Sequence, residues 1–237
     1  MTMIAILAFG QSVSAHYLWV LIDRETGPNG SVKICFEHGP GPGDGSYLDP
    51  FEASAKTSLR TPGMLKPEPL KTVDTRKDAH RWHAAALPAG APRSIDSYWK
   101  FGVYRYGTKD VLLHYYGRNL DITSRDDLKA LSRASQMNLD IVISDGSDGS
   151  DGALSAQALW MGKPAANRPV EIKGPQGFRQ KLTTDADGNV TFRPATAGQY
   201  TVRTSVEELE KSGTDNGKTY SMVRHHATMM LRLPLKN

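Results

Sequence analysis

Alternation of apolar and polar residues constrains the fold of this chain more than any other feature. A period of two is typical of β-strands, whose successive side chains point to opposite faces of a sheet. Glycine and proline, which favour turns, separate the alternating runs and are densest between Gly39 and Gly45. The runs predict strands over residues 16–22, 31–37, 79–87, 98–106, 110–116, 139–144, 153–161, 168–173, 178–184, 189–193, 198–206 and 220–233.

Helical periodicity is nearly absent, and only two short segments, at about 49–59 and 125–134, have a helical pattern. We therefore expect an all-β protein built from two β-sandwich domains. The N-terminal β-rich domain should cover residues 16–137. The C-terminal domain, residues 138–237, contains seven predicted strands in close succession, which is typical of an immunoglobulin-like sandwich. Its turn sequences also resemble those of carboxypeptidase-regulatory-like and prealbumin-type modules.

Residues 1–15 predict a secretory signal peptide. They contain an uncharged apolar run from Met3 to Phe9 and end in Val13-Ser14-Ala15, with the residues that signal peptidase accepts before its cleavage point. No Lys or Arg precedes the run, so a misassigned start codon or a short buried strand remains an alternative. Cleavage would leave His16 first in a periplasmic or secreted protein. No stretch of the mature chain approaches the roughly 20 apolar residues of a membrane-spanning helix, so we expect no transmembrane segment.

Composition excludes several classes of function. The net charge of +4 is spread along the chain without a basic cluster, which argues against nucleic acid as a partner. Cys35 is the only cysteine, so no internal disulfide can form, and its alternating surroundings predict a buried small apolar residue. The aspartates between Asp145 and Gly152 are three residues apart, which fits an acidic turn better than a calcium loop. Nucleophile, phosphate-loop and dinucleotide motifs are also missing, so we expect no enzymatic activity.

Histidines are therefore the main candidates for chemistry. After cleavage, His16 would offer its α-amino nitrogen and its ring Nδ1 to one metal ion, and the α-amine loses its proton readily because its pKa is about 8. One further imidazole would complete a three-nitrogen site suited to copper, nickel or zinc. The alternative is that a histidine at this position is incidental. The seven histidines are His16, His38, His80, His83, His114, His225 and His226.

His225 and His226 are neighbours in a predicted strand, so their rings should point to opposite faces and only one of them can join a given site. His80 and His83 should likewise point apart. His114 is expected to be a half-buried, hydrogen-bonded histidine. His38 lies beside Glu37 at the start of the glycine-rich loop, where it would face solvent or support a neighbouring ligand.

Several motifs in order resemble a large group of secreted bacterial proteins that carry a domain of unknown function. These proteins are often labelled the periplasmic component of a cobalt or nickel ABC-type transport system. The matching stretches are Ala15-His16-Tyr17-Leu18-Trp19, Phe36-Glu37 with Pro42-Gly43-Asp44, Tyr98 to Tyr106, Leu112 to Tyr116, Leu139 to Val142, Gly162-Lys163-Pro164, Thr184 to Gly188, and Arg224 to Thr228. The chain departs from the family pattern at Arg118, where the family has lysine, and at His226, where it has an aromatic residue.

The resemblance implies two β-sandwich domains, export, a role with transition metals and a metal transporter as partner. It makes His16 and His225 the preferred metal ligands. We therefore expect a non-enzymatic periplasmic accessory protein that binds nickel, cobalt or copper. Two alternatives stay open. One is a metal-free interaction module in which Trp19, Trp82, Trp99 and Trp160 line a carbohydrate- or protein-binding face. The other is an oxidative copper enzyme that uses the same three nitrogens.

Overall fold

The computed structural model describes residues 16–133, 135, 137–146 and 152–236. The predicted signal peptide and most of the acidic turn lie outside these residues. Strands make up most of the described chain, arranged in several sheets, which confirms the all-β prediction. None of the described helices has the length and apolar character needed to cross a membrane.

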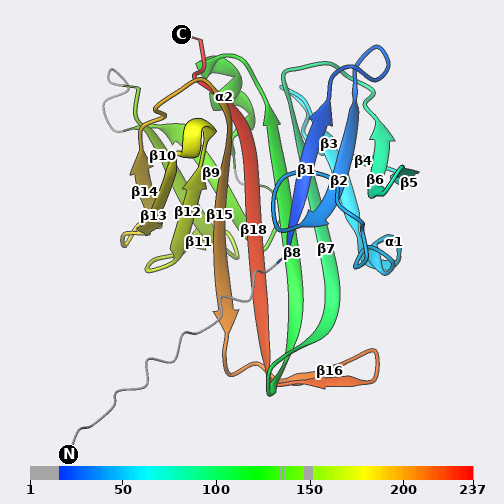
Figure 1. Ribbon diagram of the computed structural model, residues 1–237. Coiled ribbons are helices and arrows are strands. Elements are labelled where there is room, and N and C mark those ends of the chain that lie inside the picture. The colour runs from blue at the N-terminus through cyan, green and yellow to red at the C-terminus, as the bar shows by residue number, and fades with distance from the viewer. Residues whose placement is uncertain (1–15, 134, 136, 147–151, 237) are drawn as a thin grey trace, which may run out of the picture.

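A central eight-stranded sheet runs through the molecule (Figure 1). In spatial order it contains β13 (Arg179–Thr183), β12 (Pro169–Lys173), β15 (Gly198–Glu208), β18 (Met222–Leu233), β8 (Lys109–Asp121), β7 (Arg93–Tyr106), β3 (Lys56–Arg60) and β4 (Glu68–Leu70). β8 and β18 are parallel, and their register runs from Val111 opposite Met222 to Leu120 opposite Leu231. This pairing carries the sheet across the boundary expected near residue 137. The two halves of the chain therefore share one sheet and differ in the layer that covers it.

Two smaller sheets cover opposite faces of the central one. The first contains β1 (Tyr17–Asp23), β2 (Ser31–Glu37), β6 (His80–Ala86) and β5 (Val73–Lys77), in that order. The second contains β11 (Lys163–Pro164), β10 (Leu154–Trp160) and β14 (Asn189–Phe192), with β9 (Leu139–Asp145) also paired to β10. A separate hairpin is formed by β16 (Gly213–Asp215) and β17 (Lys218–Tyr220).

Alternation along β8 and β18 explains the two cores. Leu113 and Tyr115 pack with the β1–β2 layer, whereas Tyr116 and Leu120 pack with β9, β10 and β14 on the opposite face. β18 alternates in the same way, with Met229 in the second core. Because apolar burial contributes most of the favourable free energy of folding, each face of the central sheet stabilises one covering layer.

β1 is fixed to the central sheet through its backbone. Asn119 Nδ2 donates a hydrogen bond to the carbonyl oxygen of Val20 at 2.8 Å, and the Thr228 hydroxyl donates to that of Leu18. Gly117 permits this close approach, because a Cβ atom there would lie 2.9 Å from Val20 Cγ2. The start of β1, next to His16, is therefore held against β8 and β18.

The helices are shorter than expected. α2 (Arg125–Leu131) matches the predicted helix and begins with a capping box between Ser124 and Asp127. The helix expected over 49–59 is wrong for most of its length. α1 (Phe51–Ser54) covers four residues, and β3 follows because its side chains alternate and its backbone pairs with β7. One 3₁₀ turn, η1 (Pro175–Gly177), precedes β13.

Candidate functional site

His16 lies immediately before β1, and the β1–β2 hairpin positions it. The antiparallel register places Tyr17 opposite Glu37, so His16 and His38 are the next cross-strand neighbours. Their ring centroids are 4.0 Å apart. The His16 ring also stacks on Phe36 at 5.4 Å and meets the edge of Tyr47 at 5.0 Å. The histidine pair thus sits on an aromatic base.

The electrostatics around His16 favour a neutral ring. Partial burial lowers the pKa of His16, His38 lowers it further, and the nearby carboxylate of Asp44 opposes the shift. A neutral imidazole is the form that coordinates a metal. Burial also raises the pKa of Glu37, although the backbone amides of Gly45 and Gly43 donate hydrogen bonds to its carboxylate. The glycine-rich loop therefore folds over Glu37 beside the histidine pair.

These donors define what the site can bind. In the part of the chain that the structure describes, no three His, Cys, Asp or Glu side chains converge as a metal site. His16 and His38 supply two imidazoles, so a three-nitrogen site would need the α-amine of His16 as well. The donor set therefore fits a transition metal only after cleavage before His16.

The structure does not bring His16 and His225 together. Alternation in β18 points the His225 ring into the core under β9 and β10, whereas the His226 ring faces β1. The His226 ring lies 5.4 Å from that of Tyr17 and is 7% exposed. The central sheet thus separates the two predicted ligands, and the histidine that lies beside His16 is His38.

His225 belongs to a stacked array of two tyrosines and two histidines. The rings of His225 and His114 stack at 4.8 Å with an angle of 11° between their planes, and those of Tyr98 and Tyr116 lie 5.2 Å apart. The Tyr98 hydroxyl is 2.9 Å from His114 Nδ1, and the Tyr116 hydroxyl is 3.1 Å from His225 Nδ1. His114 is half-buried and hydrogen-bonded, as expected.

Glu208 sets the proton positions in this array. Its carboxylate lies 3.0 Å from His225 Nε2, and hydrogen bonds from Lys211 and His225 outweigh burial and lower the pKa of Glu208. An ionised carboxylate only accepts, so Nε2 carries the proton and Nδ1 accepts from the Tyr116 hydroxyl. Both ring nitrogens of His225 therefore have hydrogen-bond partners without a metal.

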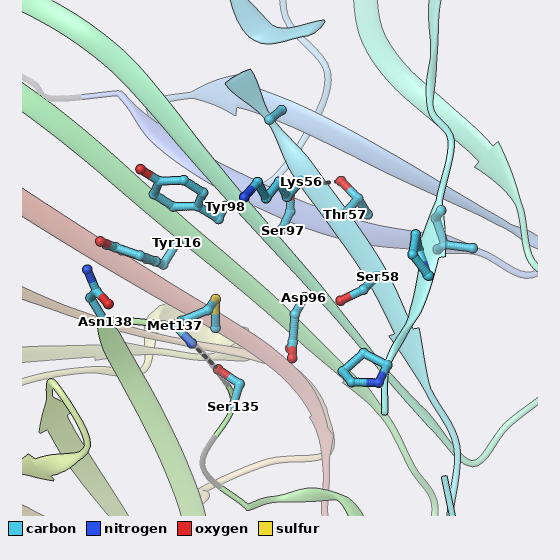
Figure 2. A pocket seen from close by; sticks show the side chains of 14 residues that line it. Lys56, Thr57, Ser58, Asp96, Ser97, Tyr98, Tyr116, Ser135, Met137 and Asn138 are labelled. Atoms are coloured by element: carbon cyan, nitrogen blue, oxygen red, sulfur yellow. Dashed lines mark hydrogen bonds between the residues drawn. The ribbon is translucent and has the colours of Figure 1, made fainter. Parts of the chain in front are cut away.

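A cavity of about 690 Å³ opens beside the two tyrosines. Figure 2 shows the Tyr98 and Tyr116 rings next to each other, with Lys56 beside Tyr98 and Asn138 beside Tyr116. The walls mix apolar and hydrogen-bonding groups, which suits a small polar molecule. Sequence reasoning missed this cavity because its residues come from segments far apart in the chain.

The tryptophans do not form an exposed binding face. Trp19, Trp82 and Trp99 are buried, and the half-buried Trp160 packs 4.5 Å from the His225 ring. His80 is exposed whereas His83 is buried, so these two histidines point apart as expected.

No curated protein matches this chain, and three similar solved structures share 10–11% sequence identity with it. The match to a cytokine receptor complex (10% identity, TM-score 0.21) covers 74% of this chain and 77% of the chain in that structure. The chicken CNTN1 FN1–FN3 domains (11%, 0.22) cover 92% and 65%, and the BSP domain of a biofilm associated protein (10%, 0.19) covers 92% and 52%. Residues 13–208 match the domain of unknown function DUF4198, and the chain belongs to that family.

Proposed function

We propose that this protein binds a transition-metal ion through His16 once residues 1–15 have been removed. The observation that carries the proposal is the cross-strand pair of imidazoles, His16 and His38, with ring centroids 4.0 Å apart. Two imidazoles and a terminal amine suit nickel, cobalt or copper better than the oxygen-preferring magnesium or calcium.

The chain's own residues would prepare the site as follows. The α-amine and Nδ1 of His16 would close a chelate ring, and the hairpin would hold the His38 ring beside it. Phe36 and Tyr47 would restrict the His16 ring to one orientation. Asp44, which interacts electrostatically with His16, would offset part of the positive charge of the ion.

We place this activity in the periplasm or outside the cell, next to a metal transporter and without catalysis. These parts of the proposal rest on the signal-peptide pattern and on the sequence resemblance. The carbohydrate-binding alternative loses its main support, because three of the four tryptophans expected to line a sugar face are buried.

Calorimetric titration with Cu²⁺, Ni²⁺ and Co²⁺ tests the proposal on protein that begins at His16. We expect one site, and we expect His38→Gln to weaken affinity by about tenfold or more, because it removes one ligand of three. The matched control is His80→Gln, which changes an exposed histidine on the same small sheet. Equal affinity of the His38→Gln and His80→Gln proteins would contradict the proposed ligand set.

A further inference from the structure

A second, chemically different site lies on the outer face of β12, β13 and β15. Figure 1 shows β1 and β2 in front of β7 and β8, with β12, β13 and β15 beyond β18. On β12, Val170 and Ile172 point into the core. Glu171 between them, and the residues opposite it on β13 and β15, therefore point outward, on the face that also carries β1 over β8 and β18.

The outward-facing row is strongly basic. Glu171 lies opposite Lys181 on β13 and opposite Arg203 on β15. Its carboxylate pairs with Arg203, with Arg179 Nη2 at 2.5 Å, and with Lys173 Nζ at 3.8 Å. Three cations thus share one carboxylate, and the fourth, Lys181, lies opposite it on β13. Glu207, also on this face, already pairs with Arg224 at 2.7 Å.

The excess positive charge is partly removed from water. Arg203 has a side chain only 16% exposed, and its guanidinium lies 4.1 Å from the centre of the Tyr17 ring. Charge held away from solvent is costly unless an opposite charge compensates it. A cavity of about 330 Å³ opens here, and its lining includes Arg179, Lys181 and Arg203 together with Glu171, Tyr17 and His226.

A second observation at this cavity concerns the buried His226. It lines the cavity, and its Nε2 has no hydrogen-bond partner among the described residues. A buried nitrogen of this kind normally has a partner, so a hydrogen-bonding group that a ligand would supply is missing from this place. Burial lowers the pKa of His226, and the neighbouring Arg224 and Arg203 lower it further.

We propose that this cavity binds a small oxyanion, a carboxylate or phosphate group, held by Arg179, Lys181 and Arg203. Guanidinium groups form paired hydrogen bonds with such groups. The volume fits a small organic acid or phosphate compound rather than a polymer. The site shares no charged residue with the histidine pair, so it stands whether or not His16 binds a metal.

Calorimetric titration of metal-free protein with citrate and with inorganic phosphate, at low salt, tests the proposal. Variants with opposite expected effects on affinity make the test specific. Arg179→Gln and Lys181→Gln, at exposed positions, should each weaken binding by about threefold or more, as expected for a lost charged hydrogen bond at a partly exposed site. Glu171→Gln should strengthen binding, because it removes the carboxylate that competes for the same cations.

Lys129→Gln on α2 is the matched control, since Lys129 is exposed and lies outside the cavity. Binding of citrate alone would identify a carboxylate ligand, binding of phosphate alone a phosphate ligand, and either result supports the site. The proposal is overturned if neither probe binds. It is also overturned if the two cation variants bind no more weakly than Lys129→Gln.

Discussion

Replacing Arg118 should destabilise the protein more than any exposed substitution. The side chain is 1% exposed in β8, and its Nε donates to Asp96 of β7 at 2.7 Å. Its Nη1 lies 3.0 Å from Asp140 of β9 and 3.2 Å from the Ile141 carbonyl oxygen. One guanidinium therefore joins two strands of the central sheet to the layer that covers them.

Arg118→Met would keep the apolar stem but leave two carboxylates without their cation. The side chains of Asp96 and Asp140 are 10% and 2% exposed, so water cannot replace the lost partner. Removing one partner from a buried ion pair costs about 3–5 kcal/mol. That cost is a large part of the roughly 5–15 kcal/mol that stabilises a typical domain. Arg118→Lys, which introduces the residue of the family pattern, keeps the charge and should cost less.

Urea unfolding followed by tryptophan fluorescence measures the effect. An unchanged slope of the free energy of unfolding against urea concentration checks for two-state behaviour. Arg105→Met is the control, because Arg105 forms an exposed ion pair with Asp110 at 3.0 Å and should contribute at most about 1 kcal/mol. If Arg118→Met unfolds within about 1 kcal/mol of the unmodified protein, the reasoning about buried charge is refuted.

Two further predictions follow from burial. Burial and nearby positive groups lower the pKa of His114 to about 4 and that of His226 to about 3. As the pH falls, these histidines therefore take up protons in the unfolded chain before they do so in the folded protein. The free energy of unfolding should then fall as the pH drops below about 6.5. Unfolding titrations between neutral pH and about pH 5 check this, and a flat profile there would be inconsistent with neutral buried histidines. Burial also raises the pKa of Cys35 to about 12, so its thiol should react with Ellman's reagent only after unfolding. Rapid reaction of the native protein would contradict the burial of Cys35 in β2.

Much of the local structure could be predicted from the sequence. The seven strands expected after Leu139 all form, with ends within about two residues, because each is an alternating or short β-branched run bounded by turn-favouring residues. Pairing over long distances could not be predicted in this way. The parallel contact of β8 with β18 depends on side chains more than 100 positions apart, and no local pattern specifies it.

The candidate site shows the same limit. Alternation correctly separated His225 from His226 but did not show which of them faces β1. Pairing the predicted run at 16–22 end to end with that at 31–37 would place His16 opposite Glu37, one residue from His38. The register in the structure pairs Tyr17 with Glu37 and so places His16 opposite His38. The oxyanion cavity had no such signal, because its residues are single positions on three strands and become a cluster only after pairing.

Moving the terminal amine tests metal binding by His16 most directly, because His16 needs its own α-amine to chelate a metal. Copper affinity should be measured for protein that begins at His16 and for protein that begins at Ala15, which moves the amine by one residue. We expect the added residue to weaken Cu²⁺ binding by about tenfold or more and to change the nitrogen coordination seen by electron paramagnetic resonance. Equal affinity and identical spectra would contradict metal binding by an N-terminal His16.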